Sequence, residues 1–224
     1  MGQIIIAIDG PAASGKGTLA RKIAEAYGYG YLDTGLLYRA VGHEVLRAGA
    51  NPDNKDSALQ AAHHIIENIS AAPLDNILHN VALREDGVGS AASRVAAIAE
   101  VRQALLEFQR NFPESQEKGA VLDGRDIGTV IFPAAPVKLF ITASTEVRAE
   151  RRLKELQSRN ISATYDAVLK DMRERDARDT GRKAAPLKAA DDAVILETSA
   201  MTAEEVLRKA LEIVRDKLRQ HKLQ

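Results

Sequence analysis

A strand, a glycine-rich turn and a helix follow one another at the start of the chain. Residues 4–8 are five apolar residues in a row, bounded by Asp9 and Gly10, which is typical of a strand buried in a parallel sheet. From Leu19 onward, apolar residues recur with helical spacing. A turn that joins a strand to a helix directs backbone N–H groups and the helix N-terminus at one anion. The feature therefore predicts an α/β fold with a phosphate-binding loop.

The turn also has the residue types that a nucleotide requires. Its glycines let the backbone curl, and its lysine adds a full positive charge aimed at the outer phosphates. A glycine-rich turn alone is weak evidence, whereas a strand, spaced glycines, a lysine, a hydroxyl and a helix together indicate nucleotide binding. The residues that we expect to bind a nucleoside triphosphate are Gly10, Pro11, Ala12, Ala13, Ser14, Gly15, Lys16, Gly17 and Thr18.

The position after Lys16 departs from the general pattern of such loops. It is occupied by Gly17, and the hydroxyl follows one place later, at Thr18. This ending resembles nucleoside monophosphate kinases more than motor ATPases or regulatory GTPases. We therefore expect no direct magnesium ligand from the protein, and Thr18 would act on the ion through water.

Composition excludes several other classes of protein. The 224 residues suffice for one domain, or for a core with insertions, and the 31 basic residues balance 31 acidic ones, which argues for neither a nucleic-acid nor a membrane partner. The absence of cysteine excludes disulfides and fits a reducing cytoplasm. We expect no signal peptide and no membrane span, and we interpret His63 and His64 as a surface pair. A soluble protein is expected.

Strand and helix patterns alternate along the chain, which predicts a three-layer fold with a central parallel five-stranded sheet and helices on both faces. The expected strands are residues 4–8, a short strand within 30–35, 120–122, 137–141 and 193–196. The expected helices start at 19 and cover 36–48, 57–68, 93–112, 145–158, 164–178 and 203–218. Residues 70–89 are the least readable, and their short apolar runs at 77–78 and 81–83 are compatible with small strands.

Polar residues follow several of these strands at their carboxyl ends, where ligands bind in such sheets. Asp123 ends an apolar strand, a position from which a carboxylate organises the water around magnesium; its alternative role is to cap the next turn. Arg125 is suited to gripping a phosphate, and Asp126 to accepting from the amino group of a base, although the two could form a surface ion pair of little value. Arg39 lies one helical turn beyond a similar polar turn at 33–35.

Two arginine-rich segments flank a turn near residue 159. A charge run of this kind is usually a solvated face with ion pairs between successive turns. However, arginine rather than lysine dominates here, and arginine suits a closing lid that neutralises phosphates and excludes water. The pattern does not say which of them act on substrate. The arginines are Arg148, Arg151 and Arg152 in the first segment and Arg173, Arg175, Arg178 and Arg182 in the second.

Read together, these residues resemble the bacterial cytidylate kinases. The matching stretches are 10–18, 33–35 with 38–39, 101–102, 123–130 with 132–133, 147–149 with 151–152, 175–176, 179, 182, 186–187 and 189–193. They occur in the family's order over nearly the whole chain. The resemblance implies in-line transfer of the γ-phosphoryl group of ATP, with Mg²⁺, to CMP or dCMP. It also implies a core (about 1–50, 93–145 and 184–224), a monophosphate-binding insertion (51–92) and a lid (146–183).

The resemblance further implies a role for each matching residue. Ser93, Arg102 and Asp126 would recognise the cytosine edge, which offers an amino donor beside a ring-nitrogen acceptor. Arg39 and Arg125 would hold the acceptor phosphate. The remaining residues would surround the acceptor or the transferring group: Thr34, Tyr38, Arg175 and Asp179 around CMP, and Lys16, Arg125 and Arg182 in catalysis.

Two other functions remain compatible with the residues. One is a phosphate-loop kinase for AMP, UMP or a small metabolite such as shikimate, against which only the three base-recognising residues argue. The other is a non-catalytic nucleotide-binding module, which would have little use for a second anion site. For a cytidylate kinase we expect a monomer in the cytoplasm that binds small-molecule substrates, neither nucleic acid nor membrane.

Overall fold

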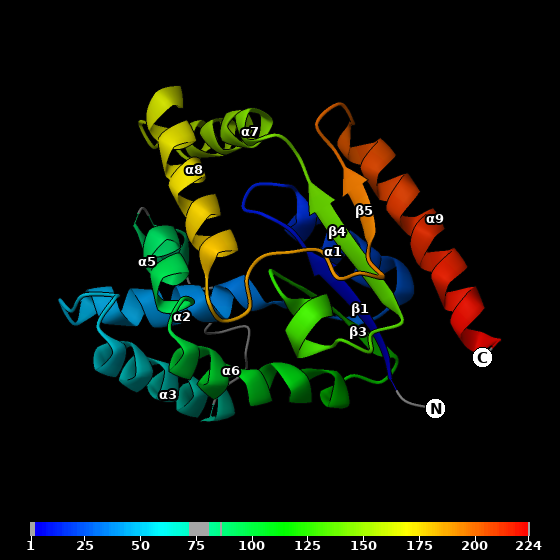
Figure 1. The fold of residues 1–224 in the computed structure, drawn as a ribbon, viewed down its shortest axis with the longest axis horizontal. Helices are drawn as coiled ribbons and strands as arrows, with labels where there is room; N and C mark the ends of the chain where they lie inside the picture. The colour runs from blue at the N-terminus through cyan, green and yellow to red at the C-terminus, as the bar shows by residue number, and fades with distance from the viewer. Residues whose placement is uncertain (1–2, 72–80, 86, 224) are drawn as a thin grey trace. The chain divides into compact units, whose positions relative to one another are not determined.

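The computed structural model describes residues 3–71, 81–85 and 87–223. The chain divides into two units, and Figure 1 labels their helices and strands. Unit 1 comprises Met1–Leu32, Pro113–Gly181 and Ala185–Gln224, and unit 2 comprises Asp33–Phe112 and Arg182–Ala184. The insertion and lid boundaries expected from the sequence stay predictions.

A five-stranded sheet in the order β2-β3-β1-β4-β5 is the centre of unit 1. β1 pairs in parallel with β3 and β4, and β4 with β5. The apolar run at 4–8 forms most of β1, the middle strand. Such a strand is apolar at successive positions because both faces of a parallel sheet are covered. The expected parallel α/β sheet is confirmed. Its strands are β1 (Ile4–Asp9), β2 (Gly30–Asp33), β3 (Gly119–Gly124), β4 (Val137–Thr142) and β5 (Val194–Glu197).

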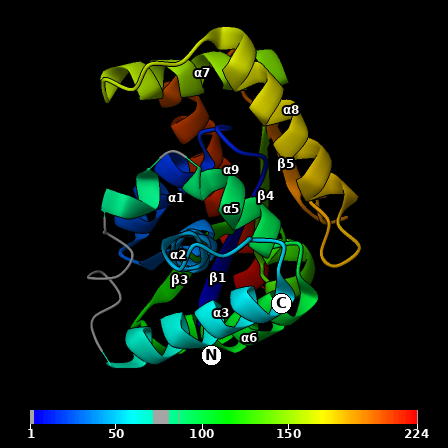
Figure 2. The same ribbon diagram turned by 90° about the vertical axis from the view of Figure 1, so that its left-hand side faces the viewer.

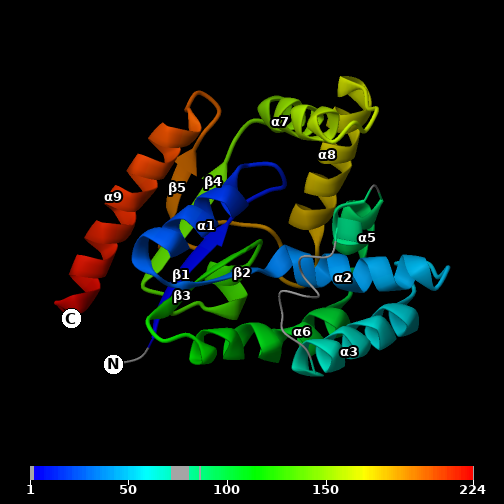
Figure 3. The same cartoon turned by 180° about the vertical axis from the view of Figure 1, so that it is seen from behind.

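One face of the sheet packs against α1 (Lys16–Tyr27) and α9 (Ala203–Lys222), which lie on the same side of it in Figure 3. Alternate strand residues point to this face, and Ile6 of β1 stands in register with Val121 and Val137 of its two neighbours. All three side chains are buried in the same apolar cluster. Burying each such side chain stabilises the fold by about 1.5–3 kcal/mol. This core fixes the end of β1 and the start of α1, and therefore the loop between them.

The two arginine-rich segments form α7 (Thr145–Ser158) and α8 (Tyr165–Gly181), which pack against each other (Figure 2). The Ser144 hydroxyl begins α7 by accepting the N–H of Val147 at 3.3 Å. A second apolar cluster joins the two helices to the loop after β1; its buried members are Ala12, Ala149, Leu156, Val168 and Met172.

Unit 2 is helical, and its closest packing joins two of its helices. An added Cβ on Gly42 would lie 2.9 Å from the backbone nitrogen of Ala92 and 3.0 Å from the carbonyl carbon of Ala91. Glycine is therefore required at position 42 for this approach. The elements are α2 (Thr34–Arg47), α3 (Lys55–Ala71), the 3₁₀ helix η1 (Val81–Arg84), α5 (Val88–Val95) and α6 (Ala99–Asn111), followed by the 3₁₀ helix η2 (Phe112–Ser115) that leads into unit 1.

Two expectations about unit 2 need correction. The single helix expected over 93–112 is two helices, because Ile98 is extended (φ −83°, ψ 117°) and begins α6 anew. No glycine or proline marks this break, so periodicity could not reveal it. The short run at 81–83 belongs to a 3₁₀ helix rather than a strand, and the run at 77–78 lies outside the described residues.

Candidate active site

The loop after β1 has the backbone of an anion-binding turn. Ala13 (φ 58°) and Gly15 (φ 87°) adopt left-handed conformations on either side of Ser14, and α1 begins at Lys16. Alternation of this kind turns successive N–H groups toward one point. At Gly10, an added Cβ would clash with the carbonyl oxygen of Ile141 on β4, so only glycine fits there. The loop's shape is therefore set by its backbone.

Two arginines of α7 hold the loop's carbonyl groups. Arg148 is buried (4% exposed) and donates to the Ala12 carbonyl at 3.3 Å, while its guanidinium also pairs with Asp176 of α8 at 2.6 Å. Arg151 donates to the Ser14 carbonyl at 3.4 Å and to the Thr198 carbonyl at 2.8 Å. Of the arginines in the charge-rich helices, these two support the loop.

Lys16 and Asp123 come together beside the loop. The Lys16 Nζ lies 3.7 Å from Oδ1 of Asp123, and the Tyr31 hydroxyl donates to Oδ2 at 3.0 Å. A Cβ on Gly17 would approach the same Oδ2 to 3.1 Å. The glycine after Lys16, which distinguishes this loop in the sequence, is explained by the close approach of Asp123. Tyr31 was not predicted as a site residue, and its place in an unremarkable short strand gave no signal.

A cavity of about 280 Å³ opens on the other side of the loop, toward α9. The Ser14 hydroxyl is buried and has no hydrogen-bond partner among the described residues. Thr18 is exposed and lines the cavity, so the structure places it and Asp123 in different surroundings. The walls are mainly apolar, with Arg151 and Lys22 as the charged members; the rest are Ser14, Gly15, Thr18, Leu19, Thr198, Met201, Ala203, Val206 and Leu207.

The donor set suits magnesium that arrives with a nucleotide. Asp123 is a buried carboxylate at the loop, and magnesium usually takes one or two protein carboxylates and completes its shell with phosphates and water. Within the described ranges no group of three or more His, Cys, Asp or Glu residues forms a metal-binding cluster.

The turn after β3 carries the next predicted residues. Arg125 donates from Nε to Oδ2 of Asp179 at 3.1 Å and from Nη1 to the Gly124 carbonyl at 3.1 Å. Its Nη2 has no partner within the part of the chain that is described, and it remains able to bind an anion. Asp126 is 4% exposed and begins η3 (Ile127–Ile131), a π-helix that the sequence did not predict. π-Helices are rare in proteins, and those that occur are often found at functional sites.

Asp9 holds this turn from the end of β1. Its Oδ1 accepts the N–H of Ile127 and its Oδ2 that of Gly128, both at 2.8 Å. Burial raises the pKa of Asp9 to about 7 against the lowering effect of these two bonds; nearby Asp126 raises it further and Lys16 lowers it. Sequence reasoning used Asp9 only as a strand boundary. An acidic residue at the end of an apolar strand was the available signal.

Within unit 2, two predicted acceptor residues meet. The Arg102 guanidinium lies over the Tyr38 ring, 5.4 Å from its centroid, and its Nη1 donates to the Ala96 carbonyl at 3.3 Å. That carbonyl ends α5 at the unexpected break, so Arg102 satisfies a group that a helix end leaves unpaired. Arg102 is 8% exposed and Tyr38 is 7% exposed. The structure therefore gives Arg102 a local structural role as well.

The other predicted residues of unit 2 are placed on the same helices. Arg39 of α2 donates to the Leu83 carbonyl of η1 at 2.9 Å. Ser93 is buried on α5, Thr34 is buried at the start of α2, and Arg182 is buried as well. Thus the predicted acceptor residues are divided: Thr34, Tyr38, Arg39, Ser93, Arg102 and Arg182 belong to unit 2, and Arg125, Asp126, Arg175 and Asp179 to unit 1.

The remaining arginines of α7 and α8 differ in their surroundings. Half-buried Arg152 pairs with exposed Glu155 at 2.8 Å within α7. Arg173 forms an ion pair with Glu146 at 3.2 Å in which both side chains are exposed. Pairs of this exposed kind contribute little to stability. Arg175, in contrast, is half-buried on α8. The solvated-face interpretation therefore applies to Arg173 in particular.

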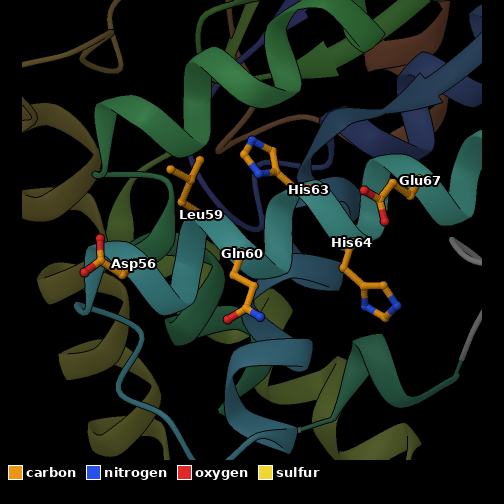
Figure 4. Close-up of a pocket in the computed structure, with 6 residues that line it drawn as sticks. All are labelled: Asp56, Leu59, Gln60, His63, His64 and Glu67. Carbon is orange, nitrogen blue, oxygen red and sulfur yellow. The ribbon is translucent and has the colours of Figure 1, made fainter.

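A further hollow runs along α3 and contains none of the predicted site residues (Figure 4). His63 and His64 point in different directions from this helix, and His64 lies 3.4 Å from a Glu44 carboxylate oxygen. The residues that line the hollow are Asp56, Leu59, Gln60, His63, His64 and Glu67.

Across the described segments, no helix is long and apolar enough to cross a membrane.

Comparisons with known proteins give one family. Residues 6–216 match the model of the family described as cytidylate kinase. A cytidylate kinase of Rhodospirillum rubrum is 56% identical over 217 residues, covering 96% of this chain and 98% of that protein. One of Paramagnetospirillum magneticum is 54% identical over 215 residues, with coverage of 95% and 98%. An uncharacterized protein from Eubacterium ventriosum, of known structure, has a TM-score of 0.54 at 16% identity, covering 94% and 97% of the two chains, which shows a likeness of fold.

Proposed function

The chain belongs to the cytidylate kinase family, and from this premise we propose that it transfers the γ-phosphoryl group of ATP to CMP and dCMP. The observation that carries the proposal is the arrangement at the end of β3. Asp123 stands beside Lys16 of the anion-binding loop, and the same strand leads directly to Arg125 and Asp126. A triphosphate site and a second anion-binding group are thus built on neighbouring parts of one rigid sheet.

The donor nucleotide is assigned to the loop and to the cavity beside it. Residues 10–18 would surround the phosphates with backbone N–H groups, and Lys16 would neutralise the outer ones. The apolar walls of the cavity suit an adenine ring, and the Arg151 guanidinium offers a planar surface for stacking. Arg151 would then link base and phosphate binding, since it also holds the Ser14 carbonyl.

The chemistry needs charge neutralisation and alignment more than a base. The acceptor phosphate is already an anion, so in-line attack requires no strong proton acceptor. Lys16 would stabilise charge on the transferring group, with Arg125 and Arg182 as further cations. Magnesium bound with ATP would supply charge neutralisation at the phosphates, and Asp123 would hold its water, with Thr18 as the second residue expected to act through water.

The acceptor is assigned residue by residue. We expect Ser93, Arg102 and Asp126 to bind the cytosine edge, because a carboxylate accepts its amino group while a cation or hydroxyl donates to its ring nitrogen. Arg39 and Arg125 would hold the phosphate. The residues assigned to the rest of the acceptor are Thr34, Tyr38, Arg175 and Asp179.

The test is turnover with a panel of acceptors. The purified protein is given ATP and magnesium with CMP, dCMP, UMP, AMP or shikimate, and ADP release is followed in a coupled assay. We expect CMP and dCMP to be phosphorylated and a Lys16→Ala protein prepared in parallel to be nearly inactive. Preference for AMP, UMP or shikimate would make the protein a different phosphate-loop kinase. ATP binding without turnover on any acceptor would favour a non-catalytic module.

The same proposal includes a monomeric enzyme of the cytoplasm, and membership of the family supports the cytoplasmic location. Light scattering of the purified protein measures its oligomeric state. Fractionation of cells that express the protein shows its location.

A further inference from the structure

Asp9 joins two segments that are far apart in the sequence. It directly precedes Gly10, the first residue of the loop, yet both its carboxylate oxygens accept backbone N–H groups from the turn after β3. The donors are Ile127 and Gly128, which immediately follow Asp126. Two hydrogen bonds accepted by one carboxylate fix the orientation of the turn as well as its position.

The turn is tightly enclosed at the same point. An added Cβ on Gly128 would lie 3.2 Å from Cδ of Lys138 on one side and 3.4 Å from Oδ2 of Asp9 on the other. Lys138 is itself fixed, because its Nζ lies 2.8 Å from Asp192. In addition, the first N–H groups of any helix lack partners within that helix. Asp9, at the end of β1, thus caps η3, which follows β3.

We propose that Asp9 is a positioning residue for the acceptor nucleotide: it holds the turn that bears Arg125 and Asp126 at a fixed place beside the phosphate loop. The inference rests on the proposed function, because it takes Arg125 and Asp126 to bind the acceptor. Asp9 itself touches neither nucleotide in this assignment. It acts through the backbone of Ile127 and Gly128.

The ionised carboxylate is the form that can accept both N–H groups. Protonation replaces one acceptor by an O–H donor that faces an N–H. The charged groups that act on the protonation of Asp9 are Asp126 from the turn and Lys16 from α1. The Lys138 side chain of β4 packs against Gly128. Since burial brings the pKa of Asp9 to about 7, the hold on the turn should weaken as the pH falls below neutrality.

The first experiment compares Michaelis constants for the two substrates. Asp9→Asn keeps the size of the side chain but replaces one acceptor oxygen by an N–H₂ donor. We expect the KM for CMP to rise about tenfold, the amount that corresponds to about 1.4 kcal/mol, while the KM for ATP changes less than twofold. Equal increases in both constants would overturn the inference, because Asp9 would then act on the loop. Unchanged constants would overturn it too.

The pH dependence separates positioning from general destabilisation. The variant cannot titrate at position 9, whereas the wild-type enzyme should come to resemble it as Asp9 gains a proton. The ratio of the two KM values for CMP should therefore fall from about tenfold at pH 8 toward unity at pH 6. Titration of the CMP phosphate affects both proteins and cancels in this ratio. A ratio that does not change with pH contradicts the inference.

Two further variants keep the test decisive if Asp9→Asn does not fold. Gly128→Ala leaves the carboxylate in place but pushes the turn from Lys138 and Asp9, and it should raise the KM for CMP selectively. Val214→Ala, in the buried face of α9, is the matched control: it lowers stability without touching the turn, and both KM values should stay unchanged. A KM for CMP that Gly128→Ala leaves unchanged overturns the inference.

Amide exchange provides a readout without turnover. The Ile127 and Gly128 amides should be protected in the wild-type protein at pH 8 and exchange at least tenfold faster in Asp9→Asn, relative to amides of α9. Equal protection would contradict the inference whatever the enzyme phosphorylates. Lack of wild-type turnover on CMP would instead overturn the proposed function and leave this readout standing.

Discussion

The phosphate loop of unit 1 and the Tyr38–Arg102 region of unit 2 are built in different ways. The loop is shaped by its backbone: Gly10 fits under the Ile141 carbonyl, Gly15 is left-handed, and Arg148 and Arg151 hold carbonyl groups. In unit 2 the predicted residues are side chains from separate helices. Arg102 of α6 stacks on Tyr38 of α2 and also satisfies the end of α5.

This difference explains why one region is readable as a motif and the other is not. A backbone site needs consecutive residues with special conformations, which leave glycines at fixed spacing. A side-chain site needs residues that only the fold brings together. The contrast also predicts different results of mutation: changes in the loop should affect transfer itself, whereas changes in unit 2 should affect the acceptor.

The largest effect is expected for Lys16→Ala. Loss of the charge at the phosphates should lower kcat about 10³-fold. The thermal midpoint should stay within a few degrees of the wild type, because Asp123, 3.7 Å from the Lys16 Nζ, keeps its hydrogen bond from Tyr31. Lys209→Ala, an exposed lysine of α9, is the control and should be neutral. Turnover close to normal would remove Lys16 from the mechanism and with it the contrast between the regions.

The second-largest effect is expected in the free energy of unfolding, through Asp9, which joins the phosphate loop to the turn after β3. The unfolded chain releases the Asp9 proton near pH 3.8, and the folded chain near pH 7. Between these values the folded state binds more protons, so this group's contribution to the free energy of unfolding falls as the pH rises. Relative to Asp9→Asn, the wild type should lose about 3 kcal/mol between pH 5 and pH 8. Denaturant unfolding at both pH values measures it, and a constant difference would disprove the raised pKa.

Asp126→Ala should change the choice of acceptor by about tenfold. A cytosine amino group that loses its carboxylate partner gives up a charge-assisted hydrogen bond, so kcat/KM for CMP should approach that for UMP. The KM for ATP should remain within twofold. Competition between CMP and UMP in one reaction gives the ratio directly, and an unchanged preference would refute the role of Asp126 in base recognition.

The smallest effect is expected for Arg102→Met. The variant loses the contact with the Tyr38 ring and the bond to the Ala96 carbonyl, and the free energy of unfolding should fall by about 1 kcal/mol. The KM for CMP should rise several-fold with little change for ATP. Arg94→Met, which removes an exposed pair with Asp53 in the same unit, should leave both KM values unchanged. A rise in the KM for ATP alone would reverse the assignment of the two regions.

The sequence allowed much of the fold to be predicted, because the evidence for it is local. The parallel sheet and the positions of most helices follow from apolar runs and helical spacing. The break between α5 and α6 was missed, since residues 96–98 carry no glycine or proline and the interruption is stabilised by Arg102 from the next helix. The π-helix after Asp126 was missed for the same kind of reason: its partner, Asp9, lies more than a hundred residues away along the chain.

The sequence by itself determined that residues 10–18 form an anion-binding loop on a parallel sheet, because glycine spacing and strand–helix periodicity are properties of neighbouring residues. Resemblance over the whole chain determined the family. Only the tertiary structure decided that Arg148 and Arg151 support the loop and that Asp9 holds the Asp126 turn. It also showed that a side chain at Gly17 would crowd the Asp123 carboxylate. These relations depend on distances between segments that chain order does not record, and on burial, the largest of the causes that bring the pKa of Asp9 to about 7.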